Sequence, residues 1–288
     1  MKIAVSGGSG FVGSHLVPAL VSRGHKVRLL MRTEANPSDG VSHIVGSISS
    51  KSVITRFLEG SDIIINLIGR FDPPFEEQIE SNVIAPLELF SNAGRMGIKR
   101  VIHISAAAVY GDSAIKKIPT ENDPTDPTTS YSLSKVLGEE VLEFCKATYG
   151  LMPVILRPTN IYGLDSRVGV LQSMKRSSLE DGMISITGDG EQVRDFIHVE
   201  DLVSAIVSIV EKPMVNPLYN VASGEAMTLN DLARIFISSV KKPIHIKYTE
   251  EAKGYVRVLR ADNSRLINDY AWKPRYTIRD TIAEILKK

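Results

Sequence analysis

Tyr131 and Lys135 are the two residues of this sequence best suited to carry chemistry. They are four positions apart, so on a helix their side chains lie one turn apart on the same face. A tyrosine hydroxyl has an ordinary pKa of about 10, and a nearby ammonium group favours its ionised form. The pair can therefore serve as a proton donor and acceptor with its tuning cation. When only these two residues are considered, the alternative is that Tyr131 starts a surface helix and Lys135 is a solvated side chain.

A glycine-rich turn forms the second group of residues with chemical potential. The sequence Gly7-Gly8-Ser9-Gly10-Phe11-Val12-Gly13 follows the first expected strand. Gly7 permits a tight turn, Gly10 lets a pyrophosphate approach the backbone, and Gly13 lets the next helix pack close to the strand. Free N–H groups at the start of that helix then face the phosphates. The motif predicts a dinucleotide site, although some glycine turns serve geometry alone.

The end of the second expected strand bears on the choice between NAD and NADP. NAD sites commonly place an acidic residue there for the ribose diol, whereas a basic residue accommodates the extra phosphate of NADP. The chain reads Leu29-Leu30-Met31-Arg32-Thr33, and the planar fork of Arg32 suits a phosphate. We therefore expect NADP in preference to NAD, with a solvated Arg32 as the alternative.

The elements that must position these residues alternate along the chain. Strands are expected at 2–6, 26–31, 62–68, 100–105 and 152–157, and helices at 11–22, 51–58, 82–96 and 131–148. This alternation predicts a Rossmann-type doubly wound α/β fold, with a parallel sheet covered on both faces. Beyond Gly163 the alternation breaks, and only a helix at 199–211 and a strand at 217–221 are expected to rejoin the sheet. We predict a dinucleotide-binding domain at 1–163, completed by 193–222, and a small discontinuous substrate lobe at 164–192 and 223–288.

Composition excludes several classes of partner. The 34 basic and 33 acidic residues give a net charge of +1, so no overall field attracts nucleic acid or an anionic membrane. Cys145 is the single cysteine, which excludes an intrachain disulfide and a multi-cysteine metal site; we expect it in the core of a helix. No apolar stretch precedes the first strand, and none approaches the roughly 18 residues of a membrane span. We expect a cytoplasmic protein that binds a small molecule and no metal.

The ordered set of motifs resembles the extended short-chain dehydrogenase/reductases, within them the epimerases and dehydratases of nucleotide sugars. Besides the glycine turn and Tyr131 to Lys135, the resemblance rests on Asn66-Leu67-Ile68-Gly69, Asn82-Val83, Ser105 through Val109-Tyr110-Gly111, Leu156-Arg157-Pro158-Thr159-Asn160-Ile161-Tyr162-Gly163, Arg194-Asp195-Phe196-Ile197-His198-Val199-Glu200-Asp201 and Tyr219-Asn220-Val221. It covers nearly the whole chain.

The resemblance implies a role for each matching residue. Tyr131 is the expected catalytic acid and base, Lys135 its partner on the nicotinamide ribose, and Asn160 and Arg194 are expected to hold the diphosphate of the nucleotide sugar. The implied cofactor contacts are Gly7, Ser9, Gly10, Phe11, Val12, Gly13, Arg32, Leu67, Gly69, Ser105, Tyr131, Lys135 and Pro158. An ion pair with Asp195 or Glu191 is the alternative for Arg194, and His198 and Asp201 are expected to cap and orient the following helix. A homodimer through the helices at 82–96 and 131–148 is also implied.

Departures from the family pattern cluster after Ser105. Ala106 stands where the family usually has a Ser or Thr hydroxyl beside the substrate oxygen, and losing such a donor costs on the order of a hundredfold in rate. Ser105 is a poor substitute because a shift of one residue along a strand reverses the side chain. Ala107 and Ala108 replace the Asp and Glu of the dehydratases, which argues against a 4,6-dehydratase. Near the C-terminus a family phosphate contact is replaced by Ala252-Lys253-Gly254-Tyr255, where Lys253 or Arg257 could compensate.

Three hypotheses follow from the matches and the departures. The first is an epimerase-like reaction in which hydride leaves a sugar carbon for the nicotinamide, the keto intermediate turns, and hydride returns to its other face. The second is an NADP-dependent reductase of a nucleotide keto-sugar or another carbonyl compound. The third is a nucleotide-binding protein with weakened catalysis.

Overall fold

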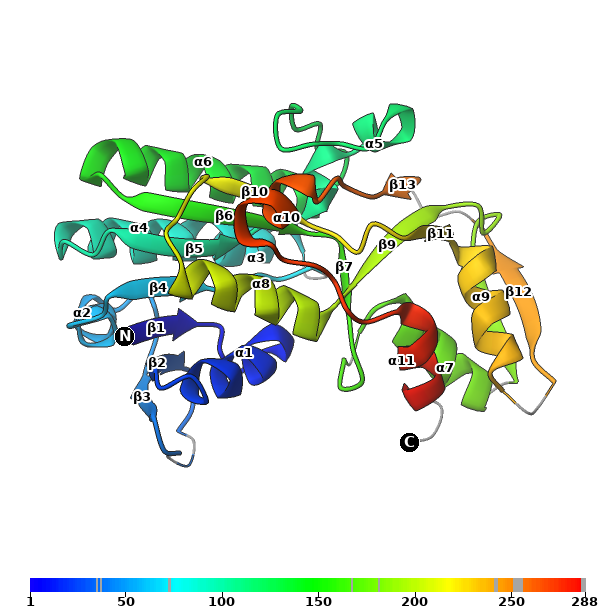
Figure 1. Cartoon of the computed structure of the whole chain (residues 1–288), viewed down its shortest axis with the longest axis horizontal. Coiled ribbons are helices and arrows are strands. Elements are labelled where there is room, and N and C mark those ends of the chain that lie inside the picture. The colour runs from blue at the N-terminus through cyan, green and yellow to red at the C-terminus, as the bar shows by residue number, and fades with distance from the viewer. Residues whose placement is uncertain are drawn as a thin grey trace.

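A parallel sheet of seven strands, ordered β10-β6-β5-β4-β1-β2-β3, forms the larger part of the molecule, to the left in Figure 1. The structure is a computed structural model that describes residues 1–34, 36, 38–71, 74–166, 168–180, 182–240, 243–250 and 256–285. The strands are β1 (Lys2–Ser6), β2 (Lys26–Met31), β3 (Val41–Val45), β4 (Ile63–Asn66), β5 (Arg100–Ile104), β6 (Met152–Pro158) and β10 (Leu218–Val221). The predicted Rossmann-type doubly wound fold is confirmed.

Alternating apolar side chains let the sheet bury both faces. In β1, Ile3 and Val5 face one core and Ala4 faces the other, and all three are fully buried. The first face is covered by α1 (Phe11–Val21), α8 (Val199–Glu211) and α10 (Ser264–Tyr270), and the second by α2 (Lys51–Leu58), α4 (Ala85–Arg95) and α6 (Ser130–Tyr149). The central strands β1 and β4 are accordingly almost continuous apolar runs, as is usual for strands buried on both faces.

The strand order reverses between β1 and β4, which lie side by side in the sheet. In doubly wound sheets a crevice forms at this point, beyond the carboxyl ends of the strands. The chain segments that leave the two strands meet there, because the Leu67 N–H donates to the Ser6 carbonyl at 2.9 Å. The glycine turn after β1 and the loop after β4 thus border one site.

A smaller region lies to the right in Figure 1 and has its own apolar core around Phe196, Leu232 and Phe236. It contains a sheet of β7 (Asn160–Tyr162), β9 (Val193–His198), β11 (Ala226–Thr228) and β13 (Val258–Leu259), a parallel pair of β8 (Met183–Thr187) and β12 (His245–Thr249), and the helices α7 (Val170–Glu180), α9 (Leu229–Ser238) and α11 (Ile278–Ile285).

The predicted division of the chain differs from the structure at three segments. β7 and β9, which were predicted for the dinucleotide-binding domain, belong to the sheet of the smaller region, and part of the predicted substrate lobe packs beneath the main sheet. Residues 223–288 were assigned to the substrate lobe, yet Leu266, Tyr270 and Trp272 belong to the core beneath the main sheet. Their apolar side chains pack with α8, and the Trp272 indole N–H donates to the Ser204 hydroxyl at 2.8 Å. The chain therefore returns to the larger region before it ends at α11.

The helix predicted at 82–96 begins earlier and is not uniform. It starts with α3 (Phe75–Ile79), widens into the π-helical segment η1 (Glu80–Ile84) and continues as α4. Pro86 lies at the start of α4 and has no N–H to donate to the preceding turn, which accounts for the wider winding there. The segment places Asn82 in the interior, fully buried.

Cys145 lies in the core face of α6, as predicted. Within the part of the chain that the structure describes, no helix has the length and apolar character needed to cross a membrane. The cytoplasmic location stays a prediction.

Candidate active site

The glycine turn after β1 is shaped by three close approaches. Gly7 has φ +74°, and a Cβ there would lie 2.8 Å from the Ile68 nitrogen. A Cβ on Gly13 would lie 2.4 Å from the Gly8 carbonyl oxygen, so α1 packs directly against the turn. A Cβ on Gly10 would meet only the Gly7 carbonyl, at 3.2 Å. Gly7 and Gly13 are thus required by the fold, whereas the room at exposed Gly10 fits the approach of a phosphate.

The start of α1 offers donors to an anion. Gly10 is its N-cap and supplies no side-chain cap, and the first turn contains no acidic residue. The first N–H groups of a helix have no partner within the helix, and the helix dipole favours a negative charge there. The turn therefore fits the pyrophosphate of a dinucleotide.

Helix α6 carries the predicted Tyr-Lys pair and is fixed firmly at its start. The Thr129 hydroxyl accepts the Ser132 N–H at 3.1 Å, and the Ser132 hydroxyl accepts the Thr129 N–H at 3.0 Å, forming a capping box. Tyr131 lies in this first turn, so capping holds its backbone in place. At the other end Gly150 terminates the helix in a left-handed conformation.

The structure brings Tyr131 and Lys135 to one face of α6, beside the ends of β4 and β5. The Lys135 ammonium lies 5.9 Å from the centroid of the Tyr131 ring and donates to the Ile104 carbonyl at 3.0 Å. Burial lowers the pKa of Lys135 to about 8, and the charge of Glu139 opposes this effect. Burial also raises the pKa of Tyr131 to about 12. Burial is the cause of this rise, and Lys135, whose ammonium lies 5.9 Å from the ring centroid, does not offset it.

Asn82 fixes the loop after β4 against this pair. Its Nδ2 donates to the Arg70 carbonyl at 3.1 Å and to the Ser134 hydroxyl at 2.8 Å, while its Oδ1 accepts the Arg70 N–H at 3.1 Å. A Cβ on the preceding Gly69 would lie 2.7 Å from the Lys135 ammonium nitrogen, so glycine leaves room for the lysine in this position. Phe71, which follows Arg70, places its ring edge-on to Tyr131, with the ring centroids 5.3 Å apart.

A buried ion pair beside the predicted site was missed by the reasoning from sequence. Arg157 donates to Glu139 through Nε at 3.0 Å and Nη2 at 2.5 Å, and the Ser105 hydroxyl donates to the same carboxylate. The Ser105 side chain, predicted to contact the cofactor, is thus committed to α6. The spacing of Tyr131, Lys135 and Glu139 at every fourth residue was the available signal.

The other predicted cofactor residues surround the same edge of the sheet. Ser9 and Arg32 are exposed, and Arg32 directly follows β2; within the described part of the chain it makes no ion pair. Phe11 lies near Gly163, where a Cβ would approach its ring at 3.1 Å. Val12 and Leu67 pack against the core of the sheet, and Pro158 ends β6. Their contacts with a cofactor stay predictions.

The predicted diphosphate residues lie on neighbouring strands. Asn160 of β7 donates through Nδ2 to the Asp195 carbonyl of β9 at 2.8 Å. Arg194 donates to the carbonyls of Val193 and Val256 at 2.9 and 2.5 Å, and its Nη1 also reaches the Arg257 carbonyl at 3.2 Å. The guanidinium therefore holds the start of β13, and its role toward a diphosphate stays a prediction.

Two helix-capping predictions have different outcomes. His198 caps α8 by accepting the Glu200 N–H at 3.2 Å, as expected. Asp201 instead accepts hydrogen bonds from the N–H groups of Arg275 and Tyr276, at 2.9 and 3.1 Å. It therefore holds the segment that precedes α11. Of the two cations that could compensate for the lost C-terminal contact or be solvated charges, Lys253 lies outside the described residues. Arg257 reaches the Asp189 carboxylate at 3.4 Å.

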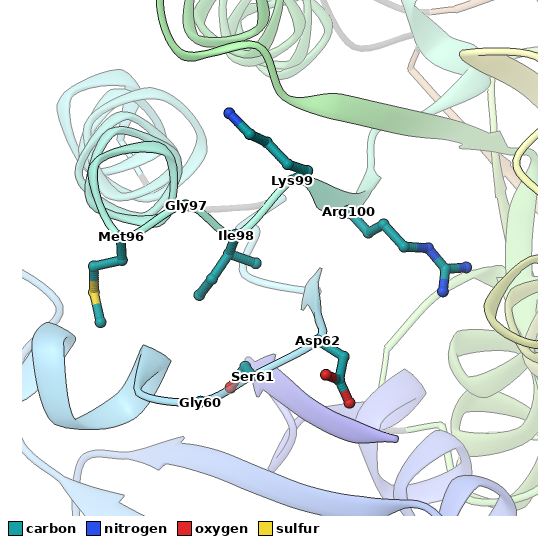
Figure 2. A pocket seen from close by; sticks show the side chains of 8 residues that line it. All are labelled: Gly60, Ser61, Asp62, Met96, Gly97, Ile98, Lys99 and Arg100. Carbon is teal, nitrogen blue, oxygen red and sulfur yellow. The ribbon is translucent and has the colours of Figure 1, made fainter.

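A hollow of about 350 Å³ lies at the amino-terminal ends of β4 and β5. It is lined by Gly60, Ser61, Asp62, Met96, Gly97, Ile98, Lys99 and Arg100 (Figure 2). Lys99 and Arg100 point away from each other there. Lys99 donates to the Tyr149 carbonyl at 2.5 Å and Arg100 to the Val210 carbonyl at 3.0 Å, so they neutralise the ends of α6 and α8. This hollow is separate from the Tyr-Lys site.

A doubly wound sheet with a glycine turn after β1 and a Tyr-Lys pair at the carboxyl edge defines an extended short-chain dehydrogenase/reductase. The sequence profile of the NAD dependent epimerase/dehydratase family matches residues 3–222. The chain belongs to this family.

Individual relatives resemble the chain over its whole length. UDP-glucose 4-epimerase of Mycolicibacterium smegmatis is 27% identical over 310 residues, covering 100% of this chain and 98% of that protein. The structure of UDP-glucose 4-epimerase from Thermotoga maritima with UDP-glucose has a TM-score of 0.87 and 26% identity, covering 100% of this chain and 98% of the other. The structure of MoeE5 in complex with UDP-glucose and NAD has a TM-score of 0.90 and 25% identity, with 100% and 99% covered.

Proposed function

We propose that this protein is a nucleotide-sugar epimerase of the UDP-glucose 4-epimerase type that uses a bound nicotinamide cofactor. The observation that carries the proposal is the placement of Tyr131 and Lys135 on one face of α6, beside the crevice where the glycine turn and the loop after β4 meet. Membership of the family and the names of its relatives support the same reaction.

The residues of the site divide the work as follows. The cofactor, when bound, supplies reversible hydride exchange with a sugar carbon. Tyr131 takes up and returns the proton of the sugar hydroxyl. Lys135 orients the cofactor ribose and supplies a positive charge, which its pKa of about 8 still allows at neutral pH. Phe71, in edge-on contact with Tyr131, and the segment held by Asn82 flank the tyrosine on the side of the loop after β4.

Conversion of UDP-galactose is the direct test of this proposal. Purified protein supplied with UDP-galactose and with NAD or NADP is expected to form UDP-glucose, detected by chromatography. Absence of product from UDP-galactose with both cofactors would exclude this reaction. A dehydratase is disfavoured because Ala107 and Ala108 carry no groups for eliminating water, and both are buried.

A second candidate, a reductase of a nucleotide keto-sugar or another carbonyl compound, is favoured by exposed Arg32. An epimerase must reuse one nicotinamide and is expected to retain it tightly, whereas a reductase consumes exchangeable NADPH. Mass spectrometry of the nucleotide that copurifies with the protein distinguishes the two. Retained cofactor supports the epimerase, and stoichiometric oxidation of added NADPH supports the reductase.

We further propose that the cofactor is NADP rather than NAD. Arg32 follows β2, where the ribose of the adenosine half is bound in doubly wound sheets, and its guanidinium has no ion pair with the described residues. Replacing it by Arg32→Asp is expected to weaken NADP binding at least roughly tenfold and to improve NAD binding. Equal affinity of the native protein for both cofactors would contradict this preference.

Exposed apolar residues support the predicted homodimer. Leu133, Leu137 and Phe144 of α6 are 39, 37 and 59% exposed, and Ile84 at the end of η1 is 38% exposed. Helices α4 and α6 pack against one another, so these side chains lie on one helical layer of the molecule (Figure 1). Light scattering after size-exclusion chromatography measures the assembly directly, and a monomer at micromolar concentration would contradict it.

A further inference from the structure

Glu139 is a buried carboxylate that the proposed chemistry does not use. It lies one turn beyond Lys135 on the same face of α6 and is only 7% exposed. Its two oxygens accept the Nε and Nη2 of Arg157 at 3.0 and 2.5 Å, and the Ser105 hydroxyl also donates to it. A buried pair with this two-point geometry has a fixed position.

Two successive turns of α6 hold two consecutive residues at the end of β5. Lys135 donates to the Ile104 carbonyl at 3.0 Å, and Glu139 accepts the hydroxyl of Ser105. These two contacts fix the position of α6 along β5. Displacement of Glu139 would therefore alter the position of the Lys135 ammonium relative to the crevice.

The same ion pair also holds the segment that follows Ser105. The guanidinium carbon of Arg157 lies 4.9 Å from the centroid of the Tyr110 ring, and Tyr110 ends the 3₁₀ turn η2 (Ala107–Tyr110). The Tyr110 hydroxyl donates to Asn220 of β10 at 2.7 Å. Ser105 and Tyr110 are thus anchored on either side of Ala106, the position where the usual hydroxyl is missing.

We propose that Glu139 is a positioning residue for the reaction: with Arg157 it fixes the segment from Ser105 to Tyr110, and it keeps the Lys135 ammonium charged and in place. The inference rests on the proposed function for the role of Lys135, which is to hold the nicotinamide ribose. Its carboxylate is bound by Arg157 and Ser105, so Glu139 acts through these residues and Lys135.

The charges around Lys135 make Glu139 the group that stabilises its protonated form. Among the described residues, the titratable side chains that interact with it are Tyr131 and Glu139 of α6 and His103 of β5, and Arg157 of β6 is bound to Glu139. Burial and the charge of Lys135 lower the pKa of His103 to about 3, so His103 is neutral. Gly69 and Asn82, which approach from the loop after β4 and from η1, carry no charge.

The test measures cofactor affinity against pH, because this readout does not require turnover of a sugar. NADH or NADPH fluorescence is titrated for the native protein and for Glu139→Gln, Glu139→Asp and Glu143→Gln. As the pH rises, the affinity of the native protein for the cofactor is expected to fall, with a midpoint near pH 8, the pKa of Lys135. Glu139→Gln is expected to move that midpoint down by roughly half a pH unit or more, and Glu139→Asp is expected to retain it because the charge is kept.

Glu143→Gln is the matched control. Glu143 lies one turn further along α6, is exposed and pairs with Lys146 at 2.8 Å. Its replacement is expected to leave both the affinity and the midpoint unchanged. An equal shift in Glu139→Gln and Glu143→Gln would overturn the proposal, since any carboxylate of the helix would then have the same effect.

A purely structural role gives a different result. If Glu139→Gln has a lower melting temperature than the native protein but the same pH midpoint of cofactor affinity, the proposal is wrong. Because Arg157 would remain buried without its partner, this variant can fail to fold. The double variant Glu139→Gln/Arg157→Gln removes both charges and is expected to show a smaller shift in the same direction. A folded double variant with the native midpoint also overturns the proposal.

Failure of the proposed function is distinguishable from failure of this inference. If the native protein binds no nicotinamide cofactor at any pH, the proposed function is refuted, and the role of Glu139 in positioning a cofactor ligand falls with it. If the native protein binds cofactor but does not epimerise UDP-galactose, only the reaction is refuted. The shift of the midpoint then still decides the role of Glu139.

Discussion

Replacement of Lys135 by methionine is expected to make the protein more stable while destroying its function. Burial lowers the pKa of Lys135 from 10.5 to about 8. At about 1.4 kcal/mol for each tenfold change, the protonated side chain costs roughly 3 kcal/mol of folding free energy. Methionine has a similar length and no charge, so it removes this cost. It also leaves the Ile104 carbonyl without its donor, and the lost hydrogen bond cancels about 1 kcal/mol of the gain in stability. The net gain at pH 7 is therefore roughly 2 kcal/mol.

The pH dependence of this gain is the sharper part of the prediction. Below pH 8 the lysine is protonated in both the folded and the unfolded protein, so the full cost is present. Between about pH 8 and pH 10.5 the folded protein releases the proton first, and the stability of the native protein rises. The advantage of Lys135→Met should consequently fall from roughly 2 kcal/mol at pH 7 to about zero at pH 10.

Thermal unfolding of protein stripped of cofactor measures the effect, because a bound cofactor would add its own stabilisation. At pH 7 the melting temperature of Lys135→Met is expected to exceed that of the native protein by roughly 4–8 °C. Lys146→Met on the same helix is the control; that lysine is 42% exposed, and its loss should change stability by less than about 0.5 kcal/mol. An unchanged melting temperature for Lys135→Met, or a gain independent of pH, would refute the reasoning.

Three further predictions concern the reaction and the cofactor. Tyr131→Phe should lower kcat by roughly 10²–10⁴-fold without weakening cofactor binding, and retained activity would remove the tyrosine from the proposed chemistry. Ala106→Ser should raise kcat by roughly a hundredfold by restoring the missing donor; no activity in either form would favour a binding role for the protein. Gly10→Ala should fold normally but bind cofactor at least roughly tenfold more weakly. Gly13→Ala should instead lower the melting temperature, because its Cβ would lie 2.4 Å from the Gly8 carbonyl oxygen. Calorimetry of folding and cofactor titration separate these two glycines, and equal behaviour would contradict their assigned roles.

The fold was largely predictable because its strands and helices carry strong local patterns. The bounds predicted for β1, β2, α2 and α8 coincide with the structure. The edge strand β3 (Val41–Val45) was not predicted, and around Glu80 the helix begins earlier than predicted and passes through a π-helical turn. Its winding depends on Pro86 and on the packing of buried Asn82 against α6, and neither produces a periodic pattern of apolar residues.

Reasoning from the sequence named residues for the candidate site, but it did not predict the contacts that their side chains make within the protein. Ser105 was assigned to the cofactor, and its hydroxyl is bound by Glu139, a residue 34 positions away. Arg194 donates to main-chain carbonyls near β13, contacts that the sequence did not predict, and its role toward a diphosphate stays a prediction. Such partners are brought together by the crossing of distant segments, about which the local sequence carries no information.

The sequence by itself determined the order of strands and helices, the glycine turn and the placement of Tyr131 and Lys135 on one helical face, because each depends on residues within a few positions of one another. The tertiary structure alone decided the charge environment of that face. Burial beside Ile104 and the proximity of Glu139 set the pKa of Lys135, and the Glu139–Arg157 pair fixes the segment that contains Ala106. These effects depend on desolvation and distance between segments that meet only when the sheet and its helices pack.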